Sequence, residues 1–177
     1  MEPHWPLSGR VGFAINTQGR NAGGKNGRDL ARNLHGQNRP ALVSSPLGRV
    51  RQTAGIISDH LNLPVTFDAR LAEVNIGEWN GHTYAEIVSH WGQHLIGVTG
   101  DDRHFHSPTG ESYDAVRDRV STWLGDQRGD TIAVMHGISG KLLRGAYAGL
   151  NCAETLALPE PQDAVFRLAD GQVGLLP

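Results

Sequence analysis

The feature that most constrains the fold is an apolar run, Thr131–Met135 (TIAVM), which His136-Gly137 follows at once. A strand that is buried on both faces is continuously apolar, whereas a strand with one wet face alternates. The residues after Gly137 repeat their apolar side chains at helical spacing as far as Leu150. The sequence therefore predicts a strand inside a sheet that helices cover.

Strands and helices alternate along most of the remaining chain. Predicted strands are Pro40–Ser45, Val65–Phe67 and a C-terminal hairpin that turns at Asp170-Gly171; predicted helices span residues 27–34, 47–61, 84–91, 112–124 and 137–150. Residues 1–26 show no convincing period and are predicted to form a loop, and residues 92–109 a long surface loop. The pattern predicts an α/β fold, a three-layer α/β/α sandwich with a mostly parallel central sheet, as a single domain over residues 1–177.

Composition narrows the class of protein and its location. The formal net charge of −2 and the mixing of acidic with basic residues argue against nucleic acid or an anionic membrane as a partner. Cys152 is the only cysteine, so no intramolecular disulfide can form. No apolar run approaches the length of a membrane span. We therefore expect a cytoplasmic protein with neither a nucleic-acid nor a membrane partner.

Two predicted strand ends carry groups suited to an anion. In open α/β sheets, ligands bind beyond the carboxyl ends of the strands, where helix N-termini point inward. Ser44-Ser45 is followed by a predicted helix that carries Arg49, and His136 closes the buried strand. An ordinary helix-capping serine, a solvated arginine and a structural histidine are the alternatives when each is taken alone.

Four segments in this order and spacing resemble the histidine phosphatase superfamily, the phosphoglycerate-mutase-like proteins of branch 1. These segments are SSPLGRVRQTA from Ser44, RLAEVNIGEWNG from Arg70, PTGES from Pro108 and VMHGISGKLLRG from Val134. The resemblance implies a phosphomonoester phosphatase that acts through a phosphohistidine intermediate. In the family, a histidine in an Arg-His-Gly motif at the end of the first strand attacks phosphorus.

The resemblance also implies roles for individual residues. Arg49 and His136 would neutralise the phosphoryl oxygens and, with Gly137, bind the substrate, while Glu73 would protonate the leaving oxygen. Arg51 is the alternative to Arg49, and Glu73 on its own would pass for a solvated loop residue. Glu111 and Ser112 belong to the family's Gly-Glu-Ser turn, near the site. We expect no metal or other cofactor and a small phosphomonoester as substrate; a homodimer is compatible with the sequence, which does not fix it.

The family's opening motif is incomplete. Trp5 and Glu2 match the family's tryptophan and acidic residue, which puts Met1 on the glycine and the motif's arginine and histidine upstream; Pro6 replaces the usual asparagine. The first, central strand is therefore expected to be missing, which would leave hydrogen-bonding groups exposed on its two neighbours. Three explanations stay open: a start site further upstream, a pseudoenzyme that only binds phosphate, or the filling of the vacant strand by residues 10–16, with His4 as a remote substitute nucleophile.

Two rival motifs carry less. Residues 19–25 match most of a phosphate-binding P-loop, but Asn26 stands where that loop needs Ser or Thr, and no apolar strand precedes it. His90 and His94 have the spacing of a metal pair, to which His104 and His106 could add ligands. A solvated histidine-rich loop is the simpler interpretation. Two function classes remain: a phosphoryl-transfer enzyme and a catalytically silent phosphate-binding module.

Overall fold

The computed structural model describes residues 12–17, 20–34, 39–161 and 163–176. A six-stranded sheet runs through it in the order β3-β2-β4-β1-β5-β6. Its strands are β1 (Gly12–Thr17), β2 (Ala41–Ser44), β3 (Val65–Phe67), β4 (Thr131–Met135), β5 (Asp163–Ala169) and β6 (Gln172–Leu175). The first four pair in parallel, and β5 and β6 complete the sheet with antiparallel pairing. The prediction of a mostly parallel sheet is confirmed.

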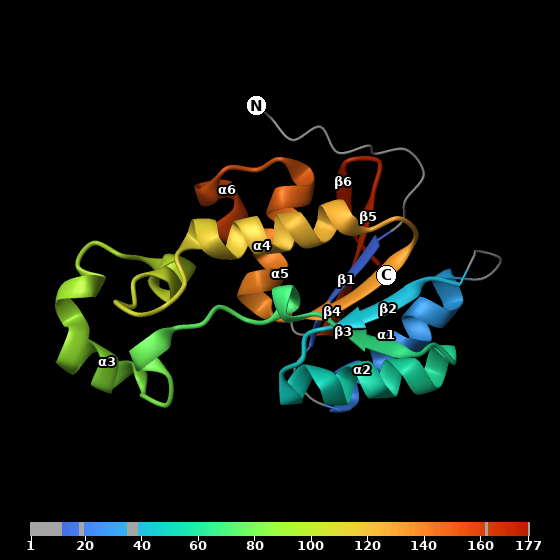
Figure 1. The fold of residues 1–177 in the computed structure, drawn as a ribbon, viewed down its shortest axis with the longest axis horizontal. Coiled ribbons are helices and arrows are strands. Elements are labelled where there is room, and N and C mark those ends of the chain that lie inside the picture. The colour runs from blue at the N-terminus through green and yellow to red at the C-terminus, as the bar shows by residue number, and fades with distance from the viewer. Residues whose placement is uncertain (1–11, 18–19, 35–38, 162, 177) are drawn as a thin grey trace.

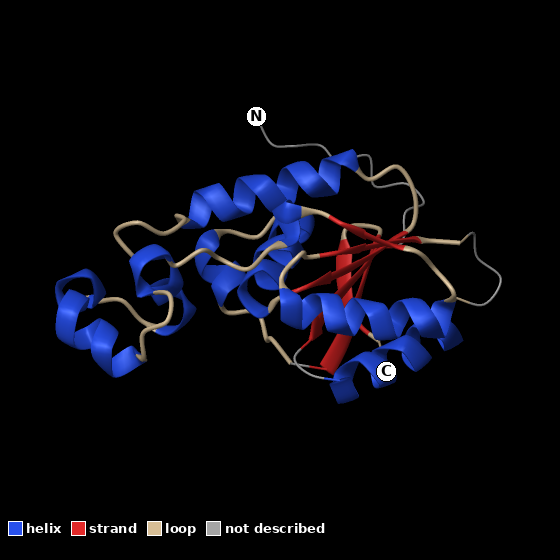
Figure 2. Ribbon diagram, turned by 60° about the horizontal axis from the view of Figure 1, so that its bottom comes forward, coloured by secondary structure: helices blue, strands red, loops and turns tan. Residues whose placement is uncertain are grey.

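Helices cover both faces of the sheet (Figures 1 and 2). They are α1 (Arg20–Asn33), α2 (Gly48–Leu61), α3 (Tyr84–Trp91), α4 (Tyr113–Asp126), α5 (Gly137–Ala148) and α6 (Cys152–Leu156), with short 3-10 turns at Ala69–Leu71, Gly77–Trp79, Gly92–Leu95 and Gly100–Phe105. Helices α1 and α2 lie together on one side, and α4 and α5 lie on the other. The three-layer sandwich predicted from the sequence is confirmed.

Strand β4 lies at the centre of the packing, as its apolar run predicts. Its five residues are all buried, and the four apolar ones alternate between two apolar clusters. Ala133 and Met135 pack with α4 and α5, whereas Ile132 and Val134 pack with α1 and α2. The strand thus separates two cores, and its carboxyl end, at His136, lies where the two helical layers meet the sheet edge.

The centre of the sheet differs from the expectation of a missing strand. Strand β1 lies between β4, with which it pairs in parallel, and β5, with which it pairs antiparallel. Residues 12–17, which overlap the segment 10–16 of the third explanation, therefore occupy the central position. The backbone hydrogen-bonding groups of β4 and β5 that face this position pair with β1. The prediction of a loop over residues 1–26 is wrong for β1 and α1; Met1, Glu2, His4, Trp5 and Pro6 lie outside the described residues.

Glycine accounts for much of this error. Helix α1 contains Gly23 and Gly27, residues that weaken a helix by about 1 kcal/mol each relative to alanine. A Cβ atom at Gly23 would lie 3.2 Å from Ile56, and one at Gly27 would lie 2.9 Å from the His60 ring. These two glycines, one turn apart, let α1 approach α2 closely. Tertiary packing thus overrides a poor local propensity.

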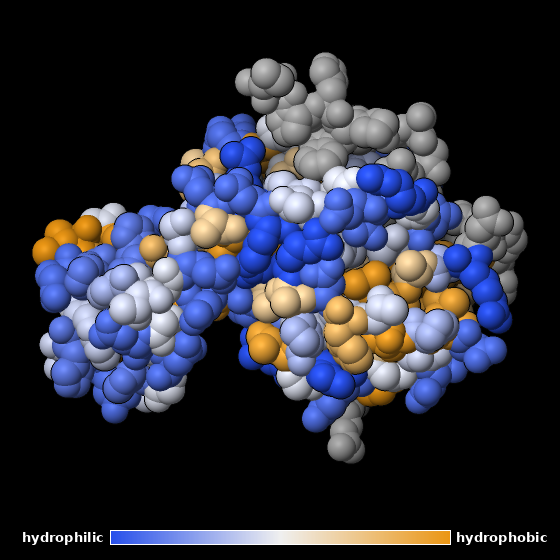
Figure 3. Space-filling view, in the orientation of Figure 1, coloured by the Kyte–Doolittle hydropathy of each residue, from blue (hydrophilic) through white to orange (hydrophobic). Residues whose placement is uncertain are grey.

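Residues 72–110 leave the sheet as an excursion, which extends away from the sandwich and contains α3 (Figure 1). The prediction of a helix over residues 84–91 is confirmed. The predicted surface loop 92–109 instead contains the 3-10 turns Gly92–Leu95 and Gly100–Phe105. Asp101 in the second turn forms an ion pair with the buried Lys141 of α5, which ties the excursion to the sandwich. Apolar surface is visible at its outer end (Figure 3).

The C-terminal hairpin has the turn that its sequence predicts. Asp170 and Gly171 have φ angles of 51° and 75°, and Ala169 pairs with Gln172 across them. A two-residue turn of this kind needs positive φ at both positions, which favours Asp-Gly. Among the helices of the described ranges, none is both long and apolar enough to cross a membrane.

Candidate active site

The parallel strands β2 and β4 bring two sequence-predicted residues into contact. Ser44 of β2 is in register with Val134 of β4, so the residues just beyond the two strands lie at one sheet edge. The Oγ atom of Ser45 lies 2.8 Å from Nε2 of His136. Segments 91 positions apart in the chain are thus joined by a hydrogen bond, at the edge where an α/β sheet binds its ligands.

His136 is a neutral, buried imidazole. Only 2% of the residue is exposed, and burial, followed by the positive charges of Arg49 and Arg119, lowers the pKa of His136 to about 3. Its Nδ1 atom is buried and has no hydrogen-bond partner among the described residues. An unpaired buried nitrogen costs free energy in the absence of a ligand. The structure therefore presents a polar atom that a bound group can satisfy.

The two arginines of α2 have different surroundings. The guanidinium of Arg51 lies 4.2 Å from the centroid of the Phe67 ring, a cation–π contact at the edge strand β3. Arg49 is exposed, and its charge acts on His136. The charge of Arg49 thus acts on His136, whereas Arg51 contacts Phe67 at the edge of the sheet.

Glu73 reaches the N-terminus of α5, directly after His136. One carboxylate oxygen accepts from the backbone N–H of Ser139 at 2.9 Å and from that of Val74 at 3.1 Å. The other accepts from the N–H of Ile138 at 3.4 Å. Free N–H groups and the helix dipole make such an N-terminus a site for anions. Glu73, which is 66 residues from Ser139 in the chain, is therefore part of the His136 site rather than a solvated loop residue.

A bidentate ion pair holds the loop that carries Glu73. Arg119 of α4 donates to both carboxylate oxygens of Glu111, at 2.8 and 3.0 Å. It also donates to the carbonyl oxygens of Arg70 and Ala72, at 2.6 and 2.9 Å. Burial alone would raise the pKa of Glu111, but the hydrogen bonds from Arg119 and the Asn75 N–H, with the Arg119 charge, hold that pKa below its usual range.

Sequence reasoning missed Arg119, although a signal was present. The buried residues of α4 include Val116, Val120 and Trp123, and position 119 is three residues after the first and four before the last. An arginine at such a core-facing spacing needs a buried partner. Glu111 is that partner, so the predicted Gly-Glu-Ser residue braces the site, while Ser112 caps α4 by accepting from the Ala115 N–H.

Gly137 begins α5 and faces another acidic side chain. A Cβ atom at this position would lie 2.7 Å from Oε2 of Glu160, so a larger residue here would displace the Glu160 carboxylate. Lys141, one turn further along α5, lies 4.0 Å from the same oxygen. Of the sequence-predicted residues, Glu73, His136 and Gly137 thus lie at the junction of β4 and α5, and Arg49 acts on His136 through its charge.

The rival motifs do not build sites in the structure. Within the described ranges, no three His, Cys, Asp or Glu side chains gather closely enough to hold a metal ion, and His90 is bonded through Nδ1 to the Glu86 carbonyl of its own helix. Of the segment 19–25, residues 20–25 belong to α1 rather than to a phosphate loop; position 19 lies outside the described residues.

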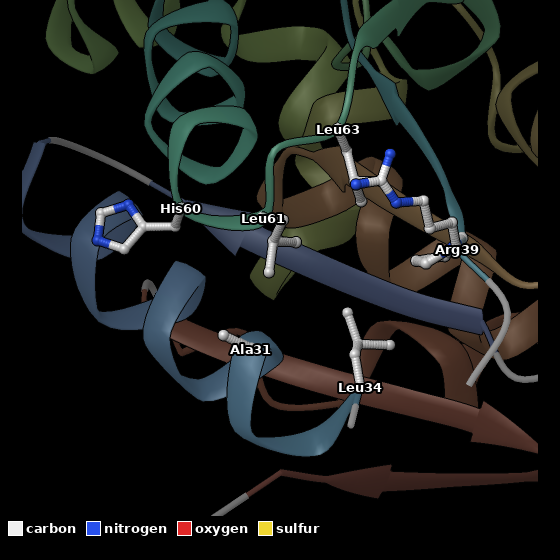
Figure 4. A pocket seen from close by; sticks show the side chains of 7 residues that line it. Ala31, Leu34, Arg39, His60, Leu61 and Leu63 are labelled. Atoms are coloured by element: carbon white, nitrogen blue, oxygen red, sulfur yellow. The ribbon is translucent and has the colours of Figure 1, made fainter. Parts of the chain in front are cut away.

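A hollow of about 230 Å³ lies at the opposite end of β2. Residues from α1, α2 and the segments next to them line it: Ala31, Leu34, Arg39, Pro40, His60, Leu61 and Leu63. Figure 4 shows His60 at one end and Arg39 and Leu63 at the other. Pro40 precedes β2, whereas Ser45 follows it, so the hollow is remote from His136 and brings together none of the predicted site residues.

Comparison with known protein families identifies the family of this chain. The model of the histidine phosphatase superfamily (branch 1) matches residues 2–168. The chain belongs to this superfamily. The resemblance inferred from the four motif segments is confirmed.

Individual relatives agree with this membership. A curated Citrobacter koseri protein, "Probable phosphoglycerate mutase GpmB", is 36% identical over 117 residues, 62% of this chain and 53% of its own length. An Escherichia coli protein of the same name is 34% identical over the same shares. The chain spans about half the length of the curated relatives it matches.

Solved structures share the fold. "Bacillus stearothermophilus YhfR" superposes with a TM-score of 0.73 at 18% identity, covering 94% of this chain and 95% of its own. A mycobacterial glucosyl-3-phosphoglycerate phosphatase, in a complex with inorganic phosphate, superposes with a TM-score of 0.70 at 21% identity, covering 93% of each chain. Both likenesses concern the α/β/α architecture.

Proposed function

We propose that this chain carries the phosphate site of a phosphomonoester phosphatase at the carboxyl ends of β2 and β4. The observation that carries the proposal is the 2.8 Å hydrogen bond between Ser45 and His136, which joins two of the family's motif segments in one buried site. Arg49 adds a positive charge there. A small phosphomonoester is the substrate class that such a pocket suits, and a cytoplasmic location fits a chain with one cysteine.

Each residue has a distinct role in this proposal. Arg49 and the imidazole N–H of His136 stabilise the charge on the phosphoryl oxygens, and the first amides of α5 add backbone donors. Glu73 holds those amides in the free protein. An incoming phosphoryl group, which is also an anion, takes over these amides, and the released Glu73 carboxylate takes up a proton from water and then donates it to the leaving oxygen.

The nucleophile separates the enzyme from the alternative. The mechanism implied by the family needs a histidine at the end of the central strand, and β1 ends in Asn16-Thr17. Asn16 is in register with Met135, the residue before His136, so this end of β1 lies beside the proposed pocket. This observation favours, as the second candidate, a module that binds phosphate without turnover.

Hydrolysis of p-nitrophenyl phosphate, together with binding of orthovanadate, tests both candidates. We expect the chain as printed to bind vanadate without turnover above background. If a preceding apolar strand that ends in Arg-His-Gly takes the place of β1 beside β4, the extended chain should gain turnover, and the matched chain that ends in Arg-Gln-Gly should not. An inert extended chain that binds vanadate supports the silent module. If, in addition, His136→Ala leaves vanadate binding unchanged, the phosphate site itself is refuted.

A further inference from the structure

The hydroxyl group of Ser45 has two partners in the structure. Besides the 2.8 Å contact with Nε2 of His136, its Oγ atom accepts from the backbone N–H of Leu47 at 3.3 Å. Ser45 is fully buried, and His136 is nearly so. A hydroxyl can donate one hydrogen and accept two, so both contacts fit it only in particular arrangements of hydrogen.

Those arrangements decide where His136 carries its hydrogen. The Leu47 N–H can only donate, so the Ser45 oxygen accepts there, and the hydroxyl hydrogen needs an acceptor of its own. Among the described residues, Nε2 of His136 is the only acceptor in contact with it. A hydrogen on Nε2 would leave two buried groups unpaired, the hydroxyl hydrogen and the bare Nδ1, whereas a hydrogen on Nδ1 leaves only the Nδ1–H unpaired, so the second arrangement is favoured.

We infer that Ser45 is a positioning residue that holds His136 in the tautomer with its hydrogen on Nδ1. The Ser45 hydroxyl then donates to the bare Nε2. The N–H that remains is at Nδ1, the buried atom without a described partner. On the proposed function, this N–H is the donor that His136 offers to a phosphoryl oxygen. The low pKa of His136 agrees, because a neutral ring has only one N–H to present.

Two-bond ¹H–¹⁵N correlation spectra of the full chain, recorded near pH 7, test the inference directly. In the wild type we expect a protonated, pyrrole-like Nδ1 and a bare, pyridine-like Nε2 for His136. Ser45→Ala should shift both nitrogens towards a mixture of tautomers, and Ser45→Thr, which keeps the hydroxyl, should restore the wild-type spectrum. Ser44→Ala is the matched control, since the Ser44 hydroxyl donates to the Ser45 carbonyl and not to the ring.

The outcomes separate the inference from the proposed function. A wild-type spectrum with the hydrogen on Nε2 overturns the inference without any variant, as does an unchanged tautomer in a folded Ser45→Ala protein. Orthophosphate titration is the second measurement. We expect Ser45→Ala to bind about tenfold more weakly and Ser45→Thr to bind within about twofold of the wild type. A wild type with the Nδ1 tautomer but no phosphate affinity supports the inference and refutes the phosphate site.

Discussion

The two ends of strand β2 lie next to different surroundings. At its amino end lies the hollow of about 230 Å³, lined largely by Leu and Ala side chains. At its carboxyl end, Ser45 is hydrogen-bonded to His136, and the Glu73 carboxylate accepts from a backbone N–H of the helix that follows His136. The amino end thus offers an open volume with few polar groups, whereas the carboxyl end offers polar side chains that are already hydrogen-bonded.

This difference indicates where chemistry can occur. His60, at the hollow, is exposed and bonds through Nδ1 to the Ile56 carbonyl one turn back in its own helix, as a surface histidine does. His136 is buried, neutral and held by a residue distant in sequence. A buried polar group whose pKa is strongly shifted and whose nitrogen lacks a partner marks a functional site better than an open volume does.

The brace behind the site should give the largest effect. Arg119→Ala leaves the Glu111 carboxylate and two carbonyl oxygens without their donor, so we expect the free energy of unfolding to fall by about 3 kcal/mol. Urea denaturation measures it. Arg128→Ala is the control, because the exposed Arg128 guanidinium donates to the Gly125 carbonyl at the surface, and it should change stability by less than about 0.5 kcal/mol. Equal losses of stability in the two variants would show that the Arg119–Glu111 ion pair does not stabilise the fold.

Stability should depend on pH through His136. Its folded pKa is about 3 and its unfolded pKa about 6.5. Below about pH 6.5 the unfolded chain binds a proton that the folded chain does not, so stability falls as pH falls. Between pH 7 and pH 5 the loss from this one group is about 2 kcal/mol.

Urea titrations at both pH values check this dependence. His136→Gln should lose about 2 kcal/mol less than the wild type between the two pH values. His94→Gln, a change at an exposed residue, should retain the wild-type dependence. A wild-type slope in His136→Gln would mean that the folded protein protonates this ring, contrary to the buried neutral site.

The two arginines of α2, Arg49 and Arg51, should differ in their effect on phosphate binding. Arg49→Ala should weaken orthophosphate binding about tenfold, since a charge-assisted contact contributes about 1.4 kcal/mol or more. Arg51→Ala should leave the affinity within about twofold and cost about 0.5–1 kcal/mol of stability through its contact with Phe67. Calorimetric titration measures the affinities. The reverse ranking would show that Arg51 is the pocket arginine.

The smallest effect is expected at the hollow. His60→Gln and Arg39→Ala change its two ends (Figure 4), and neither should alter phosphate affinity by more than about twofold, because both lie at the other end of β2 from His136. The same calorimetric titration applies. A loss comparable to that of Arg49→Ala would mean that anions bind at the hollow, and the comparison would be reversed.

Sequence patterns predicted the parts of the fold in which local preference and packing agree. The continuous run of β4, the helical spacing of α2 and the Asp170-Gly171 turn each satisfied both, and the structure has all three. Helix α1 failed this test, because its glycines look like loop residues until Ile56 and His60 of α2 are placed against them. Strand β1 was named only as one way to fill the vacant position, because its short apolar stretch is surrounded by residues that look like a loop.

The site was predictable to a similar extent. Motif order indicated Arg49, Glu73, Gly137 and His136; in the structure Glu73, Gly137 and His136 lie at one junction, and the charge of Arg49 acts on His136. Contacts between distant segments could not be predicted. The hydrogen bonds of Glu73 to the α5 amides, and those of Arg119 to the carbonyl oxygens of the 70–75 loop, depend on how α4 packs against that loop. A charged residue at a core-facing position of α4 was the signal available.

The most direct measurement of the central claim is an orthophosphate titration of the full chain, followed at the ring nitrogens of His136 and His60 by ¹⁵N NMR. A phosphate anion at the carboxyl ends of β2 and β4 should shift the His136 nitrogens in a saturable way and leave those of His60 in place. An unchanged His136, or a saturable shift at His60 alone, would contradict the assignment of the phosphate site.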